Sequence, residues 1–553
     1  MPTIEISYKD ICNLIGKKIP LEKFREELIL TVKGEIDDVK GDTIKLDIKE
    51  TNRPDVWSAE GVARQIRTFL HASGAKEEKL KDSGVKVIVE KSVEKIRPII
   101  ACAVVKRVKV NDDILKQLIQ LQEKVAENFG RKRREASIGL YNFDKITFPV
   151  RYIGADPDKY AFVPLGFDHK ASLREIVNEH PKGVDYGHLI AGAKVYPLLI
   201  DAKDVIASLP PVINAEHTGR VTQETRNLFV EVTGFDAQTV NTTLCVMVKA
   251  LMDRGGQAES VTVQRNGKGI KTPWMGLETL SFEKDLVQKR LGVKLKDREL
   301  IILLRKAGYN AAIAGKKVKV AYPSYRQDIL HPVDVVEDVI ISYGYNKVDP
   351  LMVEMVTEGK VLEIQQMMRK CAEVMVGSGA QEVLSYTLTN REILERMGLN
   401  QKNIVEIENP ASKNWSVFRT SILSSLVEFA GANTHHMYPQ KVFEMGEVVI
   451  HDEKAETKTR NPTMLGYMEI SNESDYTRAR QVLERLLNSL KVEYQLSDGE
   501  HSSCISGRVA AVRVKGKMIG YIGEVHPRVL QKFGIEMPVA AFEIDLSELL
   551  NIV

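Results

Sequence analysis

Cysteine is scarce in this sequence, and the few cysteines present are scattered. The chain has five in 553 residues, with no C-x-x-C pair and no clustering with histidine. An odd, dispersed set argues against a disulfide framework or a zinc knuckle and favours reduced thiols in a cytoplasmic protein. The N-terminal residues alternate like a strand and lack the basic start and apolar stretch of a secretory signal, so none is expected. The cysteines are Cys12, Cys102, Cys245, Cys371 and Cys504.

Long hydrophobic runs and a dominant charge are also missing. The apolar run from Ile99 to Val105 falls far short of the ~20 residues that cross a bilayer, so no membrane contact is expected. The net charge is only +3, from 78 Lys and Arg against 75 Asp and Glu, so a nucleic-acid partner must meet a local patch. Hydrophobic residues make up 43%, enough for several cores, and the length predicts about three to four domains.

The familiar signatures of nucleotide and hydrolase sites do not occur. The sequence contains no G-x-x-x-x-G-K-[ST], no G-x-G-x-x-G after a predicted strand, no G-x-S-x-G and no H-E-x-x-H. A self-sufficient enzyme that uses nucleotides is therefore poorly supported.

Periodicity and composition divide the chain into four regions and predict an α+β multidomain protein. Residues 1–84 predict a small α+β unit, with strands at Thr3–Ser7 and Thr43–Ile48 and then a helix whose N-cap is Ser58. Residues 85–270 contain strand-like segments around a helix, which predicts a mixed α/β domain.

The second half of the chain changes character twice. Residues 271–348 predict a small module of helix, helix, hairpin and helix. Its first helix includes Phe282, its second has Asp297 as N-cap, and its third spans Pro332–Tyr343. Residues 349–553 alternate helices with strands, which predicts an antiparallel sheet flanked by helices.

Four acids flank the start of the last helix of the third region. Spacings of three and four place Asp334, Glu337 and Asp338 on one helix face, with Asp328 in the preceding loop. Oxygen-only ligands suit a hard cation such as Mg²⁺. Alternatively, acids near a helix N-terminus complement the macrodipole and face solvent, and composition alone favours this second interpretation.

A second cluster lies in two loops of the second region. A double proline stiffens a loop that presents Asn214, Glu216 and His217, and a strand ending at Gly234 delivers Asp236 to the next turn. Such side chains could bind a hydroxyl or amino group and position a water. The same residue types also form turns, and the residues alone favour that structural role.

The run from Arg131 to Arg134 is the only dense basic segment. Basic residues in this position could contact phosphates, but they also suit a helix C-terminus and an exposed loop. The run alone does not decide between these roles.

Several segments together resemble one family, the β subunit of phenylalanyl-tRNA synthetase in its shorter archaeal and eukaryotic form. They follow the order of that family and span nearly the whole chain. The matching segments are Thr51 to Asp55 with Glu60 to Arg64, Leu209 to Asn214, Tyr325 to Ile329 with the helix from Asp334 to Tyr345, Asn409-Pro410, Phe418 to Leu423, Phe443 to Gly446, and Gly520 to Pro527.

The resemblance implies an α2β2 heterotetramer that charges tRNA-Phe with phenylalanine using ATP and Mg²⁺. The synthetic site and the bound ATP would belong to the α subunit. Residues 349–553 resemble a class II synthetase core without catalytic motifs, and the G-x-G-x-E-R signature of a working class II site occurs nowhere in the sequence. No aminoacylation residue is therefore expected in this chain, whose last region would pack against α.

The resemblance also gives the acids of the third region a role. Residues 271–348 resemble the domain called B5, in which Asp328, Asp334, Glu337 and Asp338 would hold a Mg²⁺ at the contact with α. On this basis the metal becomes the favoured interpretation of the acidic face.

Residues 85–270 resemble the B3/B4 unit, which hydrolyses tyrosine mischarged on tRNA-Phe. An apolar pocket cannot strongly reject the added hydroxyl of tyrosine, so a second site that binds this hydroxyl restores accuracy. Family members commonly have Ser after the Asn and Thr two residues past the Asp, where this chain has Ala215 and Gln238. The candidates for binding the mischarged amino acid and positioning water are Asn214, Glu216 and Asp236, together with His217.

Two other functions fit parts of the pattern. A non-catalytic RNA-binding or assembly scaffold would carry the editing-like loops as a vestige. A stand-alone Mg²⁺-dependent phosphoryl-transfer enzyme would use the acids of the third region, but no phosphate-cradling loop accompanies them.

Overall fold

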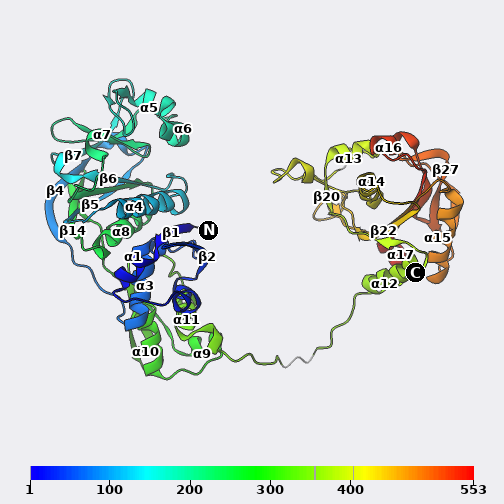
Figure 1. The fold of residues 1–553 in the computed structure, drawn as a ribbon, viewed down its shortest axis with the longest axis horizontal. Coiled ribbons are helices and arrows are strands. Elements are labelled where there is room, and N and C mark those ends of the chain that lie inside the picture. The colour runs from blue at the N-terminus through cyan, green and yellow to red at the C-terminus, as the bar shows by residue number, and fades with distance from the viewer. Residues whose placement is uncertain (1, 354–356, 403) are drawn as a thin grey trace. The chain divides into compact units, whose positions relative to one another are not determined.

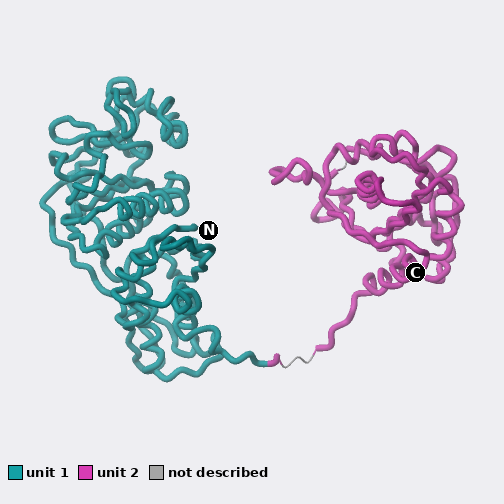
Figure 2. Tube along the Cα trace, viewed as in Figure 1, with its two compact units in different colours: residues 1–351 teal, residues 352–553 magenta. Residues whose placement is uncertain are grey.

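The chain separates into two units, residues 1–351 and 352–553, each with its own sheets and hydrophobic core (Figure 1, Figure 2). The structure is a computed structural model that describes residues 2–353, 357–402 and 404–553. Within these ranges, no helix combines the length and the apolar character that crossing a membrane requires. The five cysteines are free thiols.

The N-terminal part of unit 1 is a three-stranded antiparallel sheet with two helices: β1 (Thr3–Ser7), α1 (Tyr8–Ile15), β2 (Gly34–Lys40), β3 (Thr43–Ile48) and α3 (Ala59–His71). The predictions of β1 and β3 are confirmed. Ser58 caps α3 as predicted, and its hydroxyl accepts the backbone N–H of Gly61 at 3.2 Å. The sequence did not predict β2. It is an edge strand with several exposed charged residues and few apolar ones, so its alternation of apolar and polar residues is weak.

A ten-stranded mixed sheet forms the largest part of unit 1 (Figure 1). Across the sheet, the strands are β12 (Ile213–Asn214), β11 (Ile206–Leu209), β10 (Tyr196–Ile200), β7 (Val150–Ala155), β4 (Lys81–Val89), β14 (Gln257–Arg265), β5 (Ile99–Lys106), β13 (Leu228–Gly234) and β6 (Ala136–Asn142), with β15 (Lys268–Thr272) beside β14. Strand β4 is parallel to both neighbours, and the other pairs are antiparallel. The helices α4 (Asp112–Lys124) and α8 (Ala237–Asp253) pack with β5, β6 and β13 into one core.

The third part of unit 1 is a three-stranded sheet with three helices: β16 (Leu277–Glu283), α9 (Asp285–Leu291), α10 (Asp297–Lys306), β17 (Asn310–Ala314), β18 (Lys317–Pro323) and α11 (Pro332–Tyr343). The hairpin and α11 are confirmed. Two details of the prediction are wrong. Phe282 lies in strand β16 and not in a helix: Leu280 and Phe282, two residues apart, pair with Val320 and Val318 of β18. The N-cap of α10 is Lys296, and Asp297 is its first helical residue.

Unit 2 contains a seven-stranded sheet covered by helices on both faces. Only the edge pair β19 (Gln381–Glu382) and β22 (Gln440–Glu447) is parallel, which agrees with the predicted antiparallel sheet. The remaining strands in order are β25 (Thr463–Ile470), β29 (Val539–Asp545), β28 (Lys517–Val525), β27 (Cys504–Val514) and β26 (Gln495–Asp498). One face carries α12 (Glu363–Gly377), α15 (Tyr476–Ser489) and α17 (Leu546–Ile552), and the other carries α14 (Ile422–Ala432) and α16 (Pro527–Lys532).

Gly61 allows the backbone of α3 to contact the turn before it. An added methyl at Gly61 would collide with the backbone carbonyl of Asp55. We therefore expect Gly61→Ala to lower the free energy of unfolding of unit 1 by about 1–3 kcal/mol, although alanine is the better helix former. Gly192→Ala is the control, because nothing lies within 4 Å of its added methyl. Calorimetry of the full chain measures both variants, and equal melting temperatures would contradict the prediction.

Candidate functional site

A cavity of about 340 Å³ lies where the large sheet curves until its two ends, β6 and β11–β12, approach each other. Two contacts join these ends: the Asn214 side chain donates to the Leu140 carbonyl at 3.0 Å, and the Tyr141 hydroxyl lies 2.7 Å from Ser208 Oγ. The walls are mostly apolar. They include Leu115 and Ile119 of α4, Ile138 and Leu140 of β6, and Leu209 and Val212.

Glu231 lies in the wall of this cavity as a buried acid. It belongs to β13, whose residues are all buried, and its Oε2 accepts a hydrogen bond from the Tyr141 hydroxyl at 2.7 Å. Burial raises the pKa of Glu231 to about 7, although the Tyr141 hydrogen bond and the positive charge of Arg97 act to lower it. The carboxyl group therefore changes charge near neutral pH.

The Glu231 carboxylate has room because its neighbour on β6 has no side chain. Gly139 pairs with Glu231 in the register of β6 and β13. A methyl group added at Gly139 would collide with the Glu231 carboxylate and the Tyr141 hydroxyl. The glycine thus leaves space for a buried polar pair in the cavity wall.

Only one of the four predicted editing residues lines this cavity. That residue is Asn214. Glu216 begins a short helix beside the cavity and pairs with Arg220, whereas His217 is exposed. Asp236 caps α8, where it accepts the backbone N–H of Thr239 at 2.7 Å, and this hydrogen bond lowers its pKa.

The two positions at which the chain departs from the family pattern also lie apart. Ala215 is 3% exposed, and Gln238 is exposed in the first turn of α8. Gln238 therefore does not reach the described cavity wall.

The sequence analysis missed Glu231, Tyr141 and Ser208. A signal for Glu231 was present, since it is the only ionisable residue in the strand from Leu228 to Gly234. Acids are rarely fully buried in an apolar strand, and those that are often belong to a functional site. Its partners could not be inferred, because they come from strands that only the curvature of the sheet brings together.

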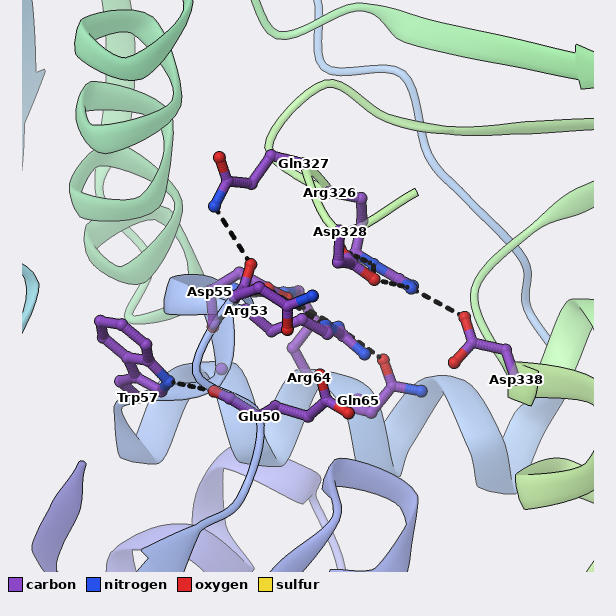
Figure 3. Close-up of polar contacts among 12 residues, drawn as sticks. Glu50, Arg53, Asp55, Trp57, Arg64, Gln65, Arg326, Gln327, Asp328 and Asp338 are labelled. Atoms are coloured by element: carbon purple, nitrogen blue, oxygen red, sulfur yellow. Dashed lines mark hydrogen bonds and ion pairs between the residues drawn. The ribbon is translucent and has the colours of Figure 1, made fainter. Parts of the chain in front are cut away.

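The acids of the third region lie where that region meets the N-terminal part of unit 1. Figure 3 shows two of them, Asp328 and Asp338. Arg326 is 4% exposed and donates to Asp328 Oδ2 at 2.6 Å and to Asp338 Oδ2 at 2.7 Å. Arg53 pairs with Asp55 at 2.8 Å beside them. Burial acts to raise the pKa of Asp328, but the guanidinium groups of Arg326 and Arg53 outweigh it and lower the pKa to about 2.

The other two acids have partners of their own. Asp334 Oδ2 accepts the backbone N–H groups of Leu330 at 2.8 Å and His331 at 2.6 Å, so it completes a capping box with His331, the N-cap of α11. Glu337 Oε1 accepts a hydrogen bond from Lys33 Nζ at 2.7 Å.

All four predicted acids line one cavity of about 40 Å³, as their spacing predicted. Each of them already has a cationic or N–H partner. In the part of the chain that the structure describes, no group of three or more His, Cys, Asp or Glu side chains is arranged to hold a metal ion. A Mg²⁺ ion could bind these acids only by displacing the protein groups that now neutralise them, among them Lys33 and Arg326.

Comparison with known proteins gives matches along the whole chain. Residues 350–546 match the family model described as phenylalanyl tRNA synthetase beta chain CLM domain, and residues 280–345 match the tRNA synthetase B5 domain. The phenylalanine–tRNA ligase beta subunit of Pyrococcus abyssi is 43% identical over 99% of this chain and 100% of its own length. The corresponding subunit of Archaeoglobus fulgidus is 36% identical over 99% of this chain and 98% of its own.

A solved structure matches as well. It is an N-terminal fragment of the phenylalanyl-tRNA synthetase beta subunit from Pyrococcus horikoshii, 43% identical, with a TM-score of 0.60. The match covers 62% of this chain and 100% of the fragment. Because relatives above 30% identity extend over nearly its full length, the chain belongs to the phenylalanine–tRNA ligase beta-subunit family of archaeal type.

Proposed function

We propose that the chain assembles with a catalytic α subunit into an α2β2 phenylalanine–tRNA ligase and that the cavity beside Glu231 hydrolyses tyrosine mischarged on tRNA-Phe. Membership of the beta-subunit family supports the assembly and the binding of tRNA. ATP would be bound by α, since this sequence lacks the G-x-G-x-E-R signature.

The buried carboxyl group of Glu231 is the observation that carries the editing proposal. A mostly apolar cavity with one convergent polar group is the usual form of a small-ligand site. A tyrosine side chain that enters this cavity places its ring against apolar walls and can donate its hydroxyl hydrogen to the Glu231 carboxylate. The volume of about 340 Å³ admits an amino-acid side chain.

The same group discriminates against phenylalanine. A phenylalanine ring would cover the carboxyl group without offering a hydrogen bond, and an unpaired buried polar group costs about 1–3 kcal/mol. Correctly charged tRNA would therefore bind more weakly and escape hydrolysis, which is the asymmetry that an editing site needs.

Of the four predicted editing residues, Asn214 lines the cavity, and this position supports its editing role. Its amide is fixed on the Leu140 carbonyl at 3.0 Å, so it can hold a bound group by its remaining oxygen. For Glu216, His217 and Asp236, the editing roles remain predictions that rest on the resemblance alone.

Glu231→Gln tests the editing site with little change of shape. We expect the holoenzyme carrying it to lose roughly tenfold in kcat/KM for deacylation of Tyr-tRNA-Phe, because a charge-assisted hydrogen bond becomes a neutral one. Asp236→Asn separates the two candidate sites. If Asp236 only caps α8, away from the cavity, this variant should keep deacylation near the wild-type rate. Aminoacylation with phenylalanine should be unchanged in both.

Two outcomes would contradict this proposal. If the wild-type holoenzyme hydrolyses Tyr-tRNA-Phe no faster than α alone, the chain is a scaffold with a vestigial cavity. If Asp236→Asn abolishes hydrolysis and Glu231→Gln does not, the site lies at the predicted loop residues instead.

The pH dependence follows from the raised pKa of Glu231. Protonation below about pH 7 removes the charged acceptor, so enzyme-catalysed deacylation of Tyr-tRNA-Phe should fall as the pH drops through this value. The ratio of enzymatic to spontaneous hydrolysis between pH 5.5 and 8.5 (roughly the range in which this group titrates) measures the effect. Glu231→Gln should flatten the profile, and a profile unchanged by that substitution would assign the titration to another group.

The Mg²⁺ assigned by resemblance to Asp328, Asp334, Glu337 and Asp338 remains a prediction. Its support is the small cavity that all four acids line. Binding there would require Lys33 to leave Glu337, because the ammonium group already neutralises that carboxylate.

Removing the two acids that Arg326 does not bind tests this assignment. If the cation is bound, the double variant Asp334→Ala, Glu337→Ala should reduce Mg²⁺-dependent assembly with α, measured by size-exclusion chromatography with Mg²⁺ or a chelator. Lys33→Met is the control, since it frees Glu337 and should strengthen the Mg²⁺ response. Equal Mg²⁺ dependence in all three proteins would contradict the assignment.

A further inference from the structure

Arg97 is a buried arginine with an unusual set of partners. It is 2% exposed and precedes β5. Among the described residues, no carboxylate lies within ion-pair distance of it, and its hydrogen bonds all go to neutral oxygens. These are the carbonyls of Arg133 (3.0 Å), Arg134 (3.0 Å) and Thr233 (2.6 Å), and the hydroxyls of Thr233 (2.9 Å) and Ser137 (3.2 Å).

One group of these bonds holds a strained turn. Arg131, Lys132 and Arg133 have φ values of +47°, +53° and +63°, a left-handed conformation that side chains disfavour. Such a turn persists only where its surroundings fix it. The guanidinium of Arg97 does so by binding the carbonyls of Arg133 and Arg134 at its end.

The turn delivers the Arg133 side chain to the cavity. Arg133 Nη1 donates to the carbonyls of Pro211 at 3.1 Å and Val212 at 2.9 Å, which belong to the cavity wall. The ring of Tyr186 lies 4.1 Å from the Arg133 guanidinium and covers it. Within the basic run, Arg133 therefore supports the cavity wall, whereas the side chains of Arg131, Lys132 and Arg134 are exposed.

The other bonds of Arg97 hold the strand that carries Glu231. Thr233 lies two residues beyond Glu231 on β13, so both side chains point to the same face. Ser137 lies on β6 and its hydroxyl is 2.9 Å from that of Thr233. The Arg97 guanidinium thus contacts both the turn that positions Arg133 against the Pro211 loop and strand β13, which carries Glu231.

We propose that Arg97 is a positioning residue of the editing cavity, which sets both the placement of the Pro211 wall and the charge of Glu231, and so the selectivity for tyrosine. This inference rests on the proposed editing function. Among the described residues, Arg97 is the charged group that acts on the Glu231 carboxyl, and its positive charge favours the carboxylate. Arg133, Lys182 and Arg220 also line the cavity. The other titratable groups around Glu231 are the neutral Tyr141, Tyr152 and Cys102.

Arg97→Met and Arg97→Lys in the holoenzyme test this role, with kcat and KM for Tyr-tRNA-Phe deacylation measured across pH. Loss of the charge in Arg97→Met should move the acidic limb of the profile upward by about one pH unit and raise KM. Arg97→Lys keeps the charge but loses most hydrogen bonds, so it should restore the position of the limb while KM stays raised. Aminoacylation with phenylalanine reports that each variant is folded.

Arg133→Met supplies an independent variant if Arg97→Met does not fold. It removes the brace and leaves the buried charge, so KM should rise with no shift of the acidic limb. A limb that stays in place in Arg97→Met, or that shifts equally in Arg97→Lys or Arg133→Met, overturns the inference. If the wild type does not deacylate Tyr-tRNA-Phe at all, the proposed function fails and the inference fails with it.

Discussion

The burial of guanidinium groups at the contacts between its parts is the constraint on which unit 1 depends. Arg254 follows α8 and reaches Asp10 of α1 and Glu60 of α3, which ties the N-terminal sheet to the large sheet. At the contact with the third part, Arg326 pairs with Asp328 and Arg53 pairs with Asp55, each within its own part. The charge of Arg53 also favours the Asp328 carboxylate across this contact. Breaking one of these pairs would leave a buried charge without its partner, at a cost of about 3–5 kcal/mol. The parts of unit 1 are therefore stable in one arrangement.

The cavity differs from these contacts, because its buried charged group has no ion-pair partner among the described residues. Among the described residues, Glu231 has no lysine or arginine within ion-pair distance, and its nearest partner is the neutral hydroxyl of Tyr141. A carboxylate that is fully paired, as Asp328 is with Arg326, has little capacity left for a ligand. A carboxyl group that is buried and only partly compensated can gain a hydrogen bond when a hydroxyl arrives. Glu231, whose charge lacks a cationic partner, is thus suited to bind a ligand, whereas acids such as Asp328 that are paired with arginine stabilise the fold.

Local features were predictable from the sequence, and partners from distant segments were not. The helix Pro332–Tyr343 was predicted with its bounds, because Pro332 starts it and Gly344 ends it. The spacing of Asp334, Glu337 and Asp338 predicts one shared face, and all three line one cavity. It gives no sign of Lys33, which precedes Glu337 by 304 residues and pairs with it there. The contact of Tyr141 with Glu231 could not be inferred for the same reason, since the two residues lie on different strands.

Two of the segments that resemble the family, far apart in the sequence, contact each other in the structure. The segment from Thr51 to Asp55 and the segment from Tyr325 to Ile329 meet in unit 1, where Gln327 donates to the Asn52 carbonyl at 3.2 Å (Figure 3). Periodicity describes one element at a time, so it gave no sign of this contact.

The left-handed turn from Arg131 to Arg133 shows a conflict between folding and function. Glycine adopts such backbone angles without strain, so a chain optimised for stability alone would place it at these positions. Glycine at position 133 would release that strain and remove the guanidinium that holds the Pro211 loop. Backbone strain alone therefore favours glycine at position 133, whereas the hydrogen bonds of the Arg133 guanidinium to the Pro211 and Val212 carbonyls favour arginine.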